Sequence, residues 1–65
     1  MIQEQMLKDL ERARQLSIEK QKTIWALSNG KTIAISEDAG ATKRALEHLG
    51  YWVCTVFENG NRVET

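Results

Sequence analysis

Residues 23–36 read TIWALSNGKTIAIS, two runs of strand-forming residues separated by the pair Asn29-Gly30. An Asn-Gly pair accepts the positive φ angles of a type I′ turn, which makes it the strongest short-range signal for a two-residue hairpin loop. A second pair, Asn59-Gly60, separates residues 51–58 from residues 61–65 in the same way. The sequence therefore predicts two β-hairpins, over 23–36 and 51–65.

The two-residue loops also predict which side chains share a face. In the first hairpin Ser28 is expected opposite Lys31, which places Trp25 opposite Ala34. One face then carries the aliphatic residues Ile24, Ala26, Ile33 and Ile35, and the other carries Trp25, Leu27, Thr32 and Ala34. In the second hairpin Phe57 is expected opposite Arg62, and Val56 opposite Val63, with Trp52 and Cys54 on the face of Val56.

Two further segments follow the period of an amphipathic helix. Residues 2–19 carry an apolar stripe at helical spacing, formed by Ile2, Met6, Leu10, Ala13 and Leu16. Residues 38–49 carry a second stripe, formed by Thr42, Ala45, Leu46 and Leu49. Ser36 or Asp38 is expected to cap this second helix, and Gly50 is placed to end it.

These elements predict one small α+β domain over residues 1–65, in the order helix, hairpin, helix, hairpin. A right-handed crossover between the hairpins makes the third strand parallel to the second. Inserting the first strand between them gives a four-stranded antiparallel sheet in the order 2-1-3-4, with the helices packed on it.

One face of this sheet has two possible coverings. If the helix over 38–49 covers the aliphatic face, the opposite face is left with an aromatic set, formed by Trp25, Leu27, Val53 and Phe57, with Tyr51 and Arg62 beside them. Soluble monomers seldom expose such a patch. Either the helix over 2–19 folds over it and closes a three-layer monomer, or both helices lie on the aliphatic face and a second copy or a partner covers the aromatic set.

Composition narrows the classes of function. Nine Lys plus Arg balance nine Asp plus Glu, so no net charge draws the chain to nucleic acid or to a membrane surface. Cys54 is the one cysteine, whereas small secreted domains usually carry several disulfides. Residues 1–20 place charges in every helical turn, unlike a signal peptide or a membrane span. The chain is therefore expected to be cytoplasmic, with no membrane partner.

The sequence offers little chemistry. Cys54 is expected in the core of a strand and His48 at the border of a helix, and one Cys with one His falls short of a zinc site. Glu37 and Asp38 suit the positive end of a helix. The glycines are isolated, so they form no phosphate-binding loop. We expect no catalytic residue, no metal and no cofactor, and hence no enzyme.

The interpretation that fits best is a small interaction protein, such as an inhibitor, adaptor or regulatory subunit, typical of accessory proteins of bacteria or phages. It would associate with itself, as a homodimer or larger, or with another protein, through the aromatic face or the stripe of the first helix. One alternative is a single-stranded nucleic-acid-binding module, in which sheet aromatics stack on bases and basic residues contact phosphates. Its residues would be Trp25, Tyr51, Phe57, Lys22, Lys31 and Arg62. Another alternative is small-ligand binding or sequestration at an oligomer interface.

Overall fold

A computed structural model describes residues 4–63 of the chain. The elements are α1 (Glu4–Glu19), β1 (Ile24–Ser28), β2 (Ile33–Ser36), α2 (Ala39–His48), β3 (Trp52–Glu58) and β4 (Asn61–Val63). The strands form one antiparallel sheet in the order β2-β1-β3-β4. The predicted α+β fold and strand order are therefore confirmed.

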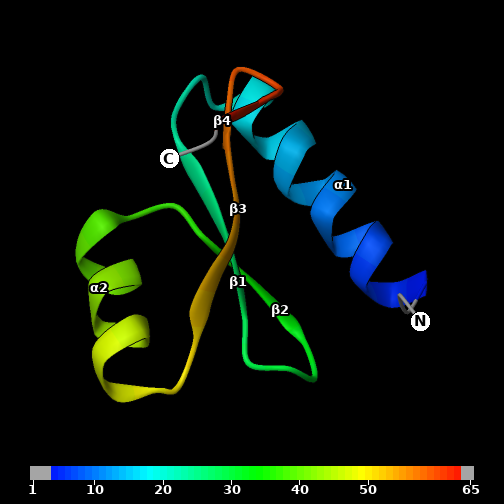
Figure 1. Cartoon of the computed structure of the whole chain (residues 1–65). Helices are drawn as coiled ribbons and strands as arrows, with labels where there is room; N and C mark the ends of the chain where they lie inside the picture. Colours follow the sequence, from blue (N-terminus) through cyan, green and yellow to red (C-terminus); the bar gives the residue numbers. More distant parts are fainter. Residues whose placement is uncertain (1–3, 64–65) are drawn as a thin grey trace.

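The two helices lie on opposite faces of the sheet, which Figure 1 shows nearly edge-on between them. α1 covers the face of Ile24 and Ala26, where Ala13 packs with no exposed surface. α2 lies on the face of Trp25, because Ser36, which is paired with Trp25, has its hydroxyl oxygen 2.7 Å from that of Thr42. The sheet is thus covered on both sides, but α1 occupies the aliphatic face that was expected to lie under the second helix.

The second Asn-Gly pair forms the predicted two-residue loop. Asn59 and Gly60 have φ angles of 50° and 83°, the positive values of a type I′ turn, and Glu58 pairs with Asn61 across them. Phe57 also lies opposite Arg62, and Val56 opposite Val63, as predicted. The turn thus fixes the register of this hairpin.

The first Asn-Gly pair forms a longer loop than predicted. Ser28 pairs with Ile33 instead of Lys31, so four residues connect the strands. The side-chain oxygen of Asn29 accepts hydrogen bonds from the backbone N–H groups of Lys31 and Thr32, at 2.9 and 3.0 Å. This Asx turn competes with the type I′ geometry, because it satisfies loop N–H groups locally. The slip of two residues leaves each side chain of β2 on its predicted face.

A β-bulge at Cys54 changes the faces of β3. Ala26 pairs with Thr55, but the next residue of β1, Leu27, pairs with Val53. Cys54 is therefore the extra residue, and side chains before it point to the opposite face from the one that simple alternation predicts. Trp52 shares the α1 side with Thr55, while Val53 shares the α2 side with Leu27.

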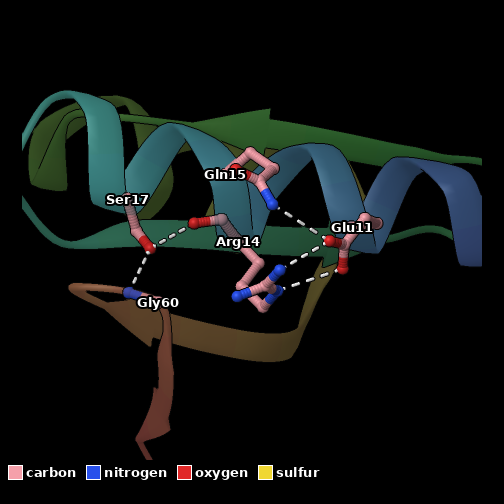
Figure 2. A network of polar contacts seen from close by, with 5 residues as sticks. All are labelled: Glu11, Arg14, Gln15, Ser17 and Gly60. Carbon is pink, nitrogen blue, oxygen red and sulfur yellow. Dashed lines mark hydrogen bonds and ion pairs between the residues drawn. The ribbon is translucent and has the colours of Figure 1, made fainter.

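α1 is also hydrogen-bonded to the turn between β3 and β4. The hydroxyl of Ser17, which is fully buried, donates to the carbonyl oxygen of Arg14 at 2.6 Å and accepts from the N–H of Gly60 at 2.9 Å. Figure 2 shows this pair of bonds beside the ion pair of Arg14 with Glu11. The C-terminal turn of α1 is thereby joined to a turn that lies 43 residues away in the sequence.

α2 begins and ends as the sequence predicts. The carboxylate of Asp38, the N-cap, accepts from the N–H of Ala41 at 2.8 Å. At the other end, the N–H groups of Leu49 and Tyr51 both donate to the carbonyl oxygen of Ala45. Gly50, with a φ of 76°, reverses the chain between them. α2 is therefore a short helix with defined ends that leads directly into β3.

Candidate interaction surface

The predicted aromatic face is divided between the two sides of the sheet. Trp25, Leu27 and Val53 lie on the α2 side, and Leu27 is buried there. Phe57 pairs with Ile24 on the α1 side and is only 4% exposed. The prediction that Phe57 shares a face with Trp25 is therefore wrong, because the pairing of β1 with β3 and the bulge place Val53 and Phe57 on opposite sides.

The two other residues of the predicted aromatic face are Arg62 and Tyr51. Arg62 is exposed and pairs with Phe57 on the α1 side. Tyr51 is half-buried in the connection before β3. Arg62 and Tyr51 do not form one continuous surface with Trp25, Leu27 and Val53.

The stripe on α1 belongs to the core of the protein. Ala13 is fully buried, and Leu10 and Leu16 pack against the cluster of Ile24, Ala26 and Phe57. Met6 is half-buried at the start of the stripe, and Ile2 lies outside the described residues. The described part of the stripe therefore holds α1 on the sheet.

A different apolar surface lies where α2 leads into β3. Within residues 4–63, six large hydrophobic side chains are classed as exposed, and four of them belong to this short segment. They are Leu46 (40% exposed), Leu49 (61%), Trp52 (52%) and Val53 (41%). We call these four residues the α2–β3 surface, in which Val53 lies on the α2 side of the sheet and Trp52 on the α1 side of the same strand end.

The sequence predicted that Leu46 and Leu49 would be buried, and this is wrong. α2 buries Thr42 and Ala45 against the sheet, so Leu46 and Leu49 lie at the edge of the contact. Within residues 4–63, β4 pairs with residues 56–58 of β3 and with none of residues 52–55. One feature of the sequence points to this surface, the uncharged run over residues 49–57.

Backbone contacts fix the shape of the α2–β3 surface. The carbonyl oxygen of Ala45 accepts from the N–H groups of Leu49 at 3.1 Å and of Tyr51 at 3.3 Å, which holds the connection against α2. Trp52 lies beside Gly30 of the first hairpin loop, where an added Cβ would be 3.5 Å from the Cη2 atom of the indole. The exposed side chains are thus presented from ordered backbone at both ends.

The ion pairs lie on other parts of the chain. Lys20 Nζ is 2.7 Å from Glu37 Oε1, and Lys22 Nζ is 3.9 Å from the same oxygen. The bond from Lys20 lowers the pKa of the Glu37 carboxyl. On α1, hydrogen bonds from Arg14 and Gln15 lower the pKa of Glu11 from 4.5 to about 2. None of these charged groups belongs to the α2–β3 surface.

The candidates for chemistry are exposed and dispersed. Cys54 is exposed, whereas the sequence predicted that it would be buried, because the bulge turns it out of the ladder. Its sulfur accepts a weak hydrogen bond from the Thr55 hydroxyl at 3.9 Å. His48 is exposed in the last turn of α2. Over residues 4–63, no three His, Cys, Asp or Glu side chains gather in a group that could hold a metal ion.

The sheet aromatics are arranged poorly for stacking on bases. A nucleic-acid platform needs aromatic rings that are open to solvent on one face of the sheet. Phe57 is buried under α1, and Trp25 is half-buried on the α2 side. Trp52 is the exposed indole, but it lies on the α1 side of the sheet, opposite to Trp25. This arrangement favours protein contact over base stacking.

Comparison of the chain with protein-family models, with curated proteins and with solved structures found no match. Among the described residues, neither helix has the length and apolar character that crossing a bilayer requires.

Proposed function

We propose that this chain is a non-enzymatic interaction module that binds another protein chain through the α2–β3 surface. The observation that supports the proposal is the grouping of Leu46, Leu49, Trp52 and Val53, all at least 40% exposed, within eight residues of sequence. Exposed apolar groups that gather in one place are typical of protein interfaces, whereas scattered ones are not.

The chemistry of the surface fits a protein partner. A protein interface has an apolar centre that is poor in charge, and aromatic side chains such as Trp are common there. The nine residues from Leu49 to Phe57 contain no charged side chain. Lys43, Arg44 and Glu47 on α2 provide an exposed polar border. The proposed centre and border therefore resemble those of a protein interface.

The proposal includes action inside a cell. Cys54 is an exposed thiol and the one cysteine of the chain, so it has no internal disulfide partner. Exposed thiols persist in reducing compartments, and small secreted domains are usually stabilised by several disulfides. An inhibitor, an adaptor and a regulatory subunit all fit this description.

Site-specific photocrosslinking tests the proposal. A photoreactive phenylalanine analogue replaces Leu49 in one variant and Lys8, which is exposed on α1 away from the proposed interface, in a control. We expect covalent protein adducts from position 49, in the purified chain or in the producing cells, and few from position 8. The adducts should decrease when Leu46→Ser is added. No adduct at position 49, or equal adducts at both positions, would contradict the proposal.

A further inference from the structure

The two Asn-Gly pairs that form the hairpin loops are also chemically reactive. In such a pair, the backbone nitrogen of the glycine can attack the carboxamide carbon of the asparagine and close a succinimide ring. The two reacting groups belong to neighbouring residues, so their reaction is favoured by proximity. Glycine has no Cβ to hinder the approach. The fold places Asn29-Gly30 and Asn59-Gly60 in different surroundings, and these surroundings predict different reactivity.

The first loop polarises the carboxamide of Asn29. Its Oδ1 atom accepts from the N–H of Lys31 at 2.9 Å and from the N–H of Thr32 at 3.0 Å. The ring that is closed by the bond to Lys31 contains both reacting atoms, Cγ of Asn29 and the nitrogen of Gly30. Negative charge develops on Oδ1 when Cγ is attacked, and N–H groups that already point at this oxygen stabilise that charge, as in an oxyanion hole.

The first loop also leaves Gly30 open to the reaction. All four residues of the loop, 29–32, are exposed. The N–H of Gly30 donates to Oγ of Ser28 at 3.1 Å, a bond to the residue two positions before it and not to another element. A Cβ at Gly30 would make only an ordinary contact with Trp52, at 3.5 Å. The Gly30 peptide can therefore turn toward Asn29 without breaking a contact with a helix.

The second loop holds its glycine against α1. The N–H of Gly60 donates at 2.9 Å to the fully buried hydroxyl of Ser17, and a Cβ at Gly60 would lie 2.8 Å from Ile18. The pairing of Glu58 with Asn61 closes the turn after two residues. Turning the Gly60 peptide toward the carboxamide before it would break the bond to α1, so this pair is protected.

We propose that Asn29 is a site of spontaneous deamidation and that the contact with α1 protects Asn59 from the same reaction. Hydroxide removes the N–H proton of Gly30, and the nitrogen forms a bond to Cγ of Asn29. The bond from Cγ to Nδ2 then breaks, and the nitrogen leaves as ammonia after taking a proton from water. Solvent water opens the succinimide at either carbonyl and leaves aspartate or isoaspartate. The sum is one water consumed and one ammonia released.

The modification changes the charge of the loop beside Trp52. Aspartate at position 29 can accept the same two N–H bonds, now strengthened by its negative charge, whereas isoaspartate adds a methylene group to the main chain. Gly30 of this loop lies next to the indole of Trp52, which belongs to the α2–β3 surface. Deamidation thus places a carboxylate at the border of that surface. The inference goes beyond the proposed function and does not depend on it.

Peptide mapping of the wild-type chain tests the inference. The chain is kept for days at 37 °C in mildly alkaline buffer, then cleaved after Lys and Arg, which separates Asn29 in residues 23–31 from Asn59 in residues 45–62. Tandem mass spectrometry measures the exchange of NH2 for OH at each position. We expect deamidation to be at least about tenfold faster at Asn29 than at Asn59 in the folded chain. In guanidinium chloride the two rates should be similar.

Three results of this mapping would overturn the inference. The first is an equal or faster rate at Asn59 in the folded chain. The second is a rate at Asn29 that rises strongly on unfolding, because the loop would then protect it. The third is the same ratio of rates in the folded and the unfolded chain, because the difference would then come from the local sequence alone.

Ser17→Ala tests the protection of Asn59 by α1. The variant is compared with Gln15→Ala, on the exposed side of the same helix, at a temperature at which circular dichroism shows both to be folded. We expect Ser17→Ala to accelerate deamidation at Asn59 and to leave the rate at Asn29 unchanged, because the Gly60 N–H loses its acceptor. Equal rates at Asn59 in the two variants would overturn the protection by α1.

Discussion

Leu27 of β1 lies opposite Val53 of β3, although its neighbour Ala26 lies opposite Thr55. The one residue left over, Cys54, reverses the faces of everything before it in β3. As a result Val53 joins the α2 side, and Trp52 is exposed on the α1 side. The position of the proposed interface follows from this bulge.

Deleting Cys54 should leave the fold intact. Without the extra residue, Val53 directly precedes Thr55 in a regular strand, and both keep their present partners on β1. We expect the deletion to change the free energy of unfolding by about 1 kcal/mol or less, measured by urea denaturation. Deleting Ala34, which lies in the regular pairing of β1 with β2, should be far more destabilising, because it moves neighbouring residues to the wrong face. Equal losses of stability in the two deletion variants would contradict the assignment of Cys54 as the extra residue of a bulge.

Replacing Ser17 by Ala should destabilise the protein. The Ser17 hydroxyl is the acceptor for the N–H of Gly60, and both groups lie at the contact of α1 with the β3–β4 turn. Losing this bond should lower the free energy of unfolding by about 1 to 3 kcal/mol, because the N–H is left without its partner. Gln15→Ala, on the exposed side of α1, should cost less than about 0.5 kcal/mol. A neutral Ser17→Ala would contradict this role.

The glycines at 50 and 60 should respond differently to Ala. Both have positive φ angles, so each substitution should cost about 1 kcal/mol of backbone strain. A Cβ at Gly50 meets nothing within 4 Å, whereas one at Gly60 would lie 2.8 Å from Cγ1 and Cδ1 of Ile18. Gly60→Ala should therefore lower the melting temperature more than Gly50→Ala. The reverse order would contradict the contact of α1 with the turn.

The Glu11 carboxyl should titrate at low pH. Hydrogen bonds from Arg14 and Gln15 and the charge of Arg14 lower its pKa to about 2. Because the folded-state pKa lies below the ordinary value of 4.5, this stabilisation is complete above that value and is lost as the pH falls toward 2. NMR titration should give a midpoint near 2, and Arg14→Ala should raise it toward 4.5. An unchanged midpoint in Arg14→Ala would contradict the ion pair.

The sequence predicted most of the fold because its strongest signals are local. The apolar stripe of α1, the cap at Asp38 and the positive-φ turn at Asn59-Gly60 depend on neighbouring residues, and the structure shows each of them. The strand order then followed from the handedness of the crossover.

The candidate surface was harder to predict because it depends on single-residue events. The side chain of Asn29 lengthens the first loop, and one additional residue at Cys54 reverses half of β3, yet neither changes the composition or the hydrophobic pattern. The choice of face by α1 depends on contacts such as Ala13 with Phe57, which join distant parts of the chain. Simple alternation therefore placed Phe57 beside Trp25, and the helical spacing of residues 38–49 placed Leu46 and Leu49 in the core.

Photocrosslinking from position 49 in the producing cells tests the central claim most directly, with Lys8, an exposed position on α1, as the control site. If the α2–β3 surface contacts another protein chain, position 49 should give covalent protein adducts and position 8 should give few. Equal adducts at both positions, or none at position 49, would contradict the account.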